Sequence, residues 1–126
     1  MDLNKYMKIV RGRHKMVSLV EPALGLASEA GEVAQIIRKQ EYERQGIKPG
    51  ILALELGDVL HYMAQMCDHL GISLEELAEL NAVKMKALDK GERRSFEAMI
   101  ALWDWSTEPM QQLTAEAEAM LEEVAR

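Results

Sequence analysis

Residues 26–37 read LASEAGEVAQII and residues 52–63 read LALELGDVLHYM, and the two stretches share one pattern of apolar and acidic positions. At about 100° per residue in a helix, the apolar positions of each stretch form one stripe, with two acids on its flank. The acids are Glu29 and Glu32 in the first stretch and Glu55 and Asp58 in the second. The pattern predicts two helices that present the same surface.

Two such helices gather their acids when they pack antiparallel, because reversing the chain direction brings both acidic flanks to the same side. The acids must also lie at the same level along the helices. Glu55 follows the Pro49-Gly50 turn closely, whereas Glu32 precedes that turn by more than about four helical turns. We therefore expect the helix that carries Glu32 to end or bend around Lys39 to Tyr42, before Gly46.

Turn and cap residues predict the remaining helices. Proline is tolerated in the first turn of a helix, and glycine is favoured just after the last turn. These signals delimit helices at about residues 3–19, 22 to before 46, 51–70, 74–90, 95–105 and 109–123. We predict an all-α fold, with an antiparallel helical bundle of four core helices in residues 1–94. Residues 95–126 are expected to form a C-terminal helical extension of the same compact unit.

Composition limits the classes of function. A chain of 126 residues fits one domain, and its many Ala, Leu, Met, Glu and Lys residues favour helices. The net charge of -6 argues against binding to a nucleic-acid polymer, so a phosphate ligand needs a cation. Cys67 is the only cysteine and is expected in the core. The sequence lacks an apolar run of membrane-spanning length, and we expect a cytoplasmic protein without membrane contacts.

Four carboxylates in one groove repel one another unless a cation or protons intervene. All-oxygen ligation, completed by waters and phosphate oxygens, is typical of Mg²⁺, for which Mn²⁺ is a possible substitute. The alternative is that the acidic pairs are solvated surface, as isolated i,i+3 pairs usually are. In that case the chain is a non-catalytic helical interaction or regulatory module.

His61 follows Asp58 by three residues, which raises a third reading. Di-iron carboxylate bundles use Glu-x-x-His on two helices together with two further glutamates. This chain has only one acid-x-x-His, so the di-iron reading is the weakest of the three.

The two acidic stretches resemble the MazG-type all-α nucleoside triphosphate pyrophosphohydrolases. The signature of that family is EExxE, a spacer and ExxD. Here Glu29 and Glu32 match the first part, Glu55 and Asp58 match the second, and Ser28 replaces the first glutamate, as in many small members. The resemblance covers about residues 15 to 94.

The resemblance implies that Glu29, Glu32, Glu55 and Asp58 bind Mg²⁺ that carries a nucleoside triphosphate. Hydrolysis would release a nucleoside monophosphate and pyrophosphate, in nucleotide-pool control or house-cleaning, with Glu29 as the expected catalytic base. Four further residues are candidates for substrate binding, namely Lys39, Tyr62, Asn81 and Lys84. Tyr62 either stacks on a base or is a half-buried tyrosine with a solvated hydroxyl group.

The acidic stretches also leave much apolar surface for a chain of this length. We expect a second copy to cover it, so that the protein is a homodimer or a homotetramer.

Overall fold

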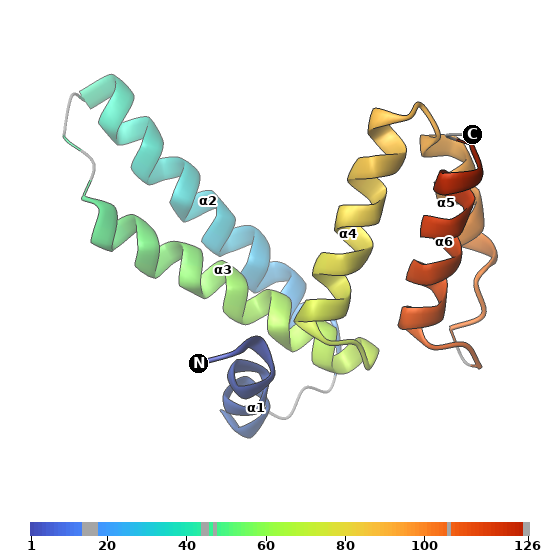
Figure 1. The fold of residues 1–126 in the computed structure, drawn as a ribbon. Helices are drawn as coiled ribbons and strands as arrows, with labels where there is room; N and C mark the ends of the chain where they lie inside the picture. Colours follow the sequence, from blue (N-terminus) through green and yellow to red (C-terminus); the bar gives the residue numbers. More distant parts are fainter. Residues whose placement is uncertain (14–17, 44–45, 47, 106, 125–126) are drawn as a thin grey trace. The chain divides into compact units, whose positions relative to one another are not determined.

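The computed structural model of the chain describes residues 1–13, 18–43, 46, 48–105 and 107–124. Within these residues there are six helices and no strand, which confirms the all-α class (Figure 1). The helices are α1 (Leu3–Arg13), α2 (Val20–Glu43), α3 (Pro49–Leu70), α4 (Leu74–Asp89), α5 (Arg93–Leu102) and α6 (Met110–Val124).

The chain divides into two compact units, Met1–Leu74 and Glu75–Arg126. The predicted boundary after residue 94 falls inside the second unit. The arrangement of four core helices in one bundle, with a C-terminal extension, therefore stays a prediction.

The predicted first helix is too long at its C-terminal end. Among the described residues α1 ends at Arg13, and Ser18 and Leu19 lie outside any helix, while positions 14–17 of the prediction lie outside the described residues. Leu19 instead lies directly before α2. Its carbonyl oxygen accepts a hydrogen bond from the N–H of Ala23 in the first turn of α2, at 3.1 Å. Pro22 falls in the first turn of α2, where a missing N–H costs no helical hydrogen bond.

Glycines end α3 and α4 as the sequence predicts. Gly71 and Gly91 have φ angles of 73° and 71°, in the left-handed region that glycine adopts without strain. The N–H of Ile72 donates to the carbonyl oxygen of Cys67 at 3.0 Å, and that of Glu92 donates to Ala87 at 2.8 Å. Both chain reversals therefore satisfy carbonyl groups that the helix ends leave free.

In the first unit, α2 and α3 run antiparallel as a hairpin, and α1 packs on α3 (Figure 1). Met7 and Val10 of α1 are buried, as are Ala64 and Cys67 of α3. Outside this contact the Arg11 guanidinium pairs with Asp68 at 2.6 Å. The predicted burial of Cys67 is confirmed, and α1 is fixed against the C-terminal half of α3.

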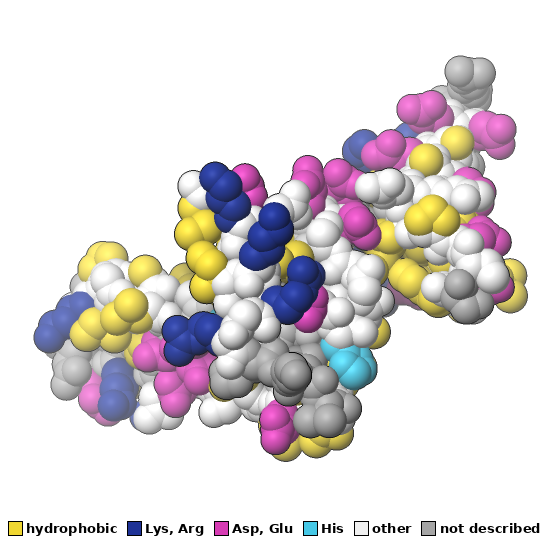
Figure 2. Space-filling model, turned by 90° about the horizontal axis from the view of Figure 1, so that it is seen from below, with side chains coloured by type: hydrophobic (Ala, Val, Ile, Leu, Met, Phe, Trp, Pro, Cys, Tyr) yellow, Lys and Arg dark blue, Asp and Glu magenta, His cyan; other side chains and the backbone are white. Residues whose placement is uncertain are grey.

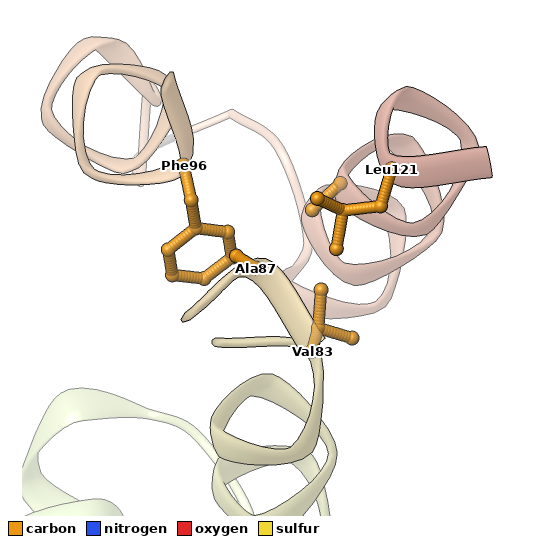
Figure 3. Close-up of a cluster of buried hydrophobic side chains, with 5 residues drawn as sticks. Val83, Ala87, Phe96 and Leu121 are labelled. Carbon is orange, nitrogen blue, oxygen red and sulfur yellow. The ribbon is translucent and has the colours of Figure 1, made fainter. Parts of the chain in front are cut away.

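The second unit has a core of its own. Helices α4, α5 and α6 surround a cluster of buried apolar side chains (Figure 3), which consists of Val83, Ala87, Phe96, Ala117 and Leu121. The ammonium group of Lys90 donates to the carbonyl oxygen of Leu121 in the last part of α6 at 2.9 Å. This bond ties the C-terminal ends of α4 and α6 together.

The α2–α3 hairpin is much less covered than the second unit. Pro22 is the only residue of α2 that is buried within the described chain. Leu24 on α2 is 67% exposed and Leu54 on α3 is 70% exposed. Figure 2 shows hydrophobic side chains at the surface around the connected ends of the two helices, on the left. The hairpin therefore keeps apolar surface that this chain does not bury.

No helix among the described residues combines the length and the apolar character that crossing a membrane requires.

Candidate metal centre

Three glutamates from the two acidic stretches meet on the α2–α3 hairpin. One carboxylate oxygen each of Glu29, Glu32 and Glu55 lies within 4.8 Å of the other two. Glu29 and Glu55 are half-buried, and Glu32 is exposed. The antiparallel packing of α2 on α3 thus places acids from both helices on one flank of the pair.

Glu32 and Glu55 lie at the same height along the hairpin because α2 is shifted along its axis relative to α3. Helix α2 continues through Lys39–Tyr42 and ends at Glu43, one residue beyond the expected range. Figure 1 shows that the C-terminal end of α2 extends beyond the N-terminal end of α3. This offset brings Glu32 level with Glu55 without a break inside α2.

Glu55 has the most perturbed electrostatics of the cluster. Its pKa is raised from the ordinary value of 4.5 to about 7. The largest cause is a hydrogen bond of the Glu55 carboxyl group with Glu32, followed by burial and by repulsion from Glu32 and Glu29. The Oε2 atom of Glu55 is buried and lacks a hydrogen-bond partner among the described residues. The cluster thus concentrates negative charge around a carboxylate that is poorly solvated.

The fourth predicted ligand, Asp58, is not a member of this three-glutamate group. Asp58 is exposed and lines a cavity of about 350 Å³ between α1 and α3, together with Tyr6, Arg13 and His61. Burial and the nearby charge of Asp58 raise the pKa of Tyr6. Asp58 follows Glu55 by about one helical turn, so it lies beside the cluster on the side of α1. The set of four ligands stays a prediction.

His61 lines the same cavity as Asp58. The Nε2 atom of His61 forms a hydrogen bond with Nε2 of Gln65 at 3.0 Å. Among the described residues His61 does not belong to the acidic group that could hold an ion. Nothing in this arrangement favours the di-iron reading.

Tyr62 packs across the hairpin against Gly25 of α2. A Cβ atom added at Gly25 would lie 2.7 Å from Cδ1 of the Tyr62 ring, well inside van der Waals contact. The ring of His61 meets Tyr62 edge-on, with centroids 5.5 Å apart and an interplanar angle of 76°. Sequence reasoning missed Gly25, although a glycine one turn before Glu29 in a helix is an available signal.

The other predicted substrate-binding residues lie away from the hairpin contact or in the second unit. Lys39 is exposed on α2, about two turns after Glu32. Asn81 and Lys84 line a largely apolar cavity of about 370 Å³, between residues of α4 such as Leu80 and residues of α5 such as Phe96. Their roles in substrate binding stay predictions.

These features define an all-helical protein with a cluster of glutamates suited to a hard cation. Residues 21–92, more than half of the chain, match the model of the MazG nucleotide pyrophosphohydrolase domain. The chain belongs to this family, which confirms the resemblance seen in the sequence and supports a nucleotide pyrophosphohydrolase activity and a need for metal at the level of the family.

One curated relative is the Gene 37 protein of Mycobacterium phage L5. It is 32% identical over 68 residues, which cover 51% of this chain and 60% of that protein. The chain therefore matches less than two-thirds of the length of this relative. No solved structure matches the chain significantly.

Proposed function

We propose that the chain is a Mg²⁺-dependent nucleoside triphosphate pyrophosphohydrolase that converts ribo- or deoxyribonucleoside triphosphates to the monophosphate and pyrophosphate. The observation that carries the proposal is the meeting of Glu29, Glu32 and Glu55 in a chain of the MazG family. Such a reaction serves nucleotide-pool control or house-cleaning.

The properties of the cluster suit a hard divalent cation. Three carboxylate oxygens within 4.8 Å of one another repel, and the buried Oε2 atom of Glu55 has no hydrogen-bond partner in the described part of the chain. A cation would bind that atom and compensate the negative charge. Carboxylate oxygens are the ligands that usually hold Mg²⁺ in proteins. Glu29, Glu32 and Glu55 would hold the ion, with Asp58 as the fourth ligand from the adjacent turn of α3. Mn²⁺ is the expected substitute.

The chemistry is hydrolysis of the anhydride bond between the α- and β-phosphates. A bound Mg²⁺ supplies charge neutralisation of phosphate oxygens and a lower pKa for water. We assign to Glu29, which is half-buried in the cluster, the role of taking the proton from the attacking water. The water oxygen forms a bond to the α-phosphorus, the bond from that phosphorus to the bridging oxygen breaks, and pyrophosphate leaves with that oxygen.

Four residues are proposed to bind the substrate. The ammonium groups of Lys39 and Lys84 and the amide of Asn81 would contact phosphate oxygens, since charged and amide donors suit such acceptors. Tyr62 would stack on the nucleobase. The net charge of -6 means that these few donors and the cation must offset the charge of the triphosphate.

A panel of ribo- and deoxyribonucleoside triphosphates with Mg²⁺ tests the proposal, with pyrophosphate and orthophosphate scored separately. We expect equal amounts of monophosphate and pyrophosphate, and no release in EDTA. Orthophosphate without pyrophosphate would refute the position of cleavage. No release from any triphosphate would favour a non-catalytic helical module.

We also propose that the working form is a homodimer or a homotetramer. The support is that α2, a helix of 24 residues, buries only Pro22 within the described chain. Most helical stability in proteins comes from packing of an apolar face, and this hairpin lacks a covering layer. A second copy of the chain supplies the same apolar stripes.

Action in the cytoplasm, apart from membranes and nucleic-acid polymers, is part of the same proposal.

A further inference from the structure

Gly25 lies where α2 passes the aromatic ring of Tyr62 on α3. A Cβ atom at Gly25 would lie 2.7 Å from Cδ1 of that ring, and closer still to Cε1 and Cζ. Ordinary contacts between carbon atoms are about 3.5–4.0 Å. The Tyr62 ring therefore occupies the space that any other side chain at position 25 would need.

The other glycines inside α1, α2 and α3 show no such contact. At Gly12, Gly31 and Gly57 an added Cβ atom meets nothing within 4 Å. An interior glycine destabilises a helix relative to alanine, so it is retained at a cost in helix stability. At Gly25 the missing side chain has a specific use, which is to admit the Tyr62 ring.

The ring is held from a second direction by its own helix. The His61 ring contacts Tyr62 edge-on, with the centroids 5.5 Å apart. Gln65, which is buried, forms a hydrogen bond with His61 at 3.0 Å. The Tyr62 ring thus lies between Gly25 of α2 and the His61 ring of its own helix.

This contact is close to the three glutamates along the hairpin. Gly25 precedes Glu29 by one turn of α2, about 6 Å of helix rise, and Tyr62 follows Glu55 by two turns of α3, about 10 Å. A nucleoside whose triphosphate is held at the glutamates would reach this contact by pointing toward the N-terminal end of α2. The Tyr62 ring is an aromatic surface at that distance.

We propose that Gly25 is a positioning residue for the nucleoside of the substrate, because it fixes the Tyr62 ring as the surface on which the base stacks. This inference rests on the proposed function and adds an orientation to it. The phosphates lie at the glutamates, and the base lies toward Gly25. Stacking on one aromatic ring changes nucleotide affinity by about tenfold or more.

The first experiment needs no turnover. The chain has three tyrosines, so labelling with 3-fluorotyrosine gives three ¹⁹F NMR signals, and Tyr62→Phe assigns that of Tyr62. We expect Gly25→Ala to shift the Tyr62 signal and Gly12→Ala to leave it in place. Addition of Mg²⁺ with an α,β-methylene triphosphate should shift the same signal in the wild-type protein. An unmoved Tyr62 signal in Gly25→Ala, or in the presence of the analogue, would overturn the inference.

The second experiment is a double-mutant cycle in steady-state kinetics. Gly25→Ala and Tyr62→Ala should each raise KM about tenfold with a much smaller change in kcat. Adding Gly25→Ala to Tyr62→Ala should have no further effect, because no ring remains to be displaced. A second tenfold rise in KM would show that Gly25 acts on the fold at large and would refute positioning. If the wild-type protein releases no pyrophosphate, the proposed function fails, and the ¹⁹F signals still decide whether Gly25 sets the Tyr62 ring.

Discussion

Glu32 on α2 and Glu55 on α3 lie with carboxylate oxygens within 4.8 Å of each other, although 22 residues separate them in the chain. Glu29 completes the same group. Like charges at this separation are unfavourable without a proton or a cation.

Glu32→Ala should abolish most of the activity while the fold remains intact. Loss of one carboxylate ligand removes part of the several kcal/mol that a bound metal contributes to charge stabilisation, so kcat/KM should fall by at least about a hundredfold. Pyrophosphate release measures the loss, and the circular dichroism spectrum reports the fold. Glu41→Ala, which removes an exposed carboxylate elsewhere on α2, is the matched control and should retain full activity. Equal activity of both variants would exclude Glu32 from the metal site.

The stability of the metal-free protein should depend on pH through Glu55. Its pKa is about 7 in the folded chain against an ordinary value of 4.5, so the folded state holds this proton more tightly than the unfolded state. The free energy of unfolding should therefore decrease as pH rises from about 4.5 to about 7 and change little above that. Thermal unfolding in EDTA measures this dependence.

Glu55→Gln is the control for this pH dependence, because an amide cannot titrate. The Tm of this variant in EDTA should fall less than that of the wild-type protein between pH 5 and pH 7. Mg²⁺ at pH 7.5 should raise the Tm of the wild-type protein and have a smaller effect on Glu55→Gln. Superimposable pH profiles for the two proteins would show that Glu55 does not carry the effect.

Lys84→Met should weaken substrate binding if its ammonium group contacts a phosphate. A hydrogen bond to a charged group contributes about 1.5–3 kcal/mol, so KM should rise about tenfold or more. Lys86→Met is the matched control, because Lys86 already pairs with Glu118 at 3.6 Å on the same unit. Steady-state kinetics of both variants give the comparison. The same KM for Lys84→Met as for Lys86→Met would remove Lys84 from the substrate site.

The mass of the protein in solution should exceed that of one chain, which is 14.2 kDa. Light scattering should report a dimer or a tetramer, because the apolar surface of the α2–α3 hairpin needs a covering layer. Leu54, which is 70% exposed on α3, tests the surface. Leu54→Glu should lower either the light-scattering mass of the assembly or its Tm. Leu54→Met should preserve both. A wild-type mass of 14.2 kDa would contradict the prediction.

The sequence by itself determined the all-α class and most helix ends, and it placed Glu29, Glu32 and Glu55 on matching helix flanks. Gly71 and Gly91 set helix ends through local backbone preferences that do not depend on distant residues, whereas α3 begins at Pro49, two residues before its predicted start. The repeated spacing of Glu29 with Glu32 and of Glu55 with Asp58 indicated a shared flank, because the periodicity of a helix fixes which residues lie on one face. The overlong first helix shows the limit of such signals, since Leu19 lies outside any helix, directly before α2, instead of extending α1.

Only the tertiary structure decided how the two acidic flanks meet. The level of Glu32 relative to Glu55 depends on the stagger of α2 against α3, and side-chain packing between the helices sets that stagger. The contact of Gly25 with Tyr62 is part of this packing, and no periodicity within either helix encodes it. The packing of α1 on α3 also decides the surroundings of Asp58. Asp58 lies near Tyr6 of α1, whereas Glu55, one turn earlier on α3, meets the glutamates of α2.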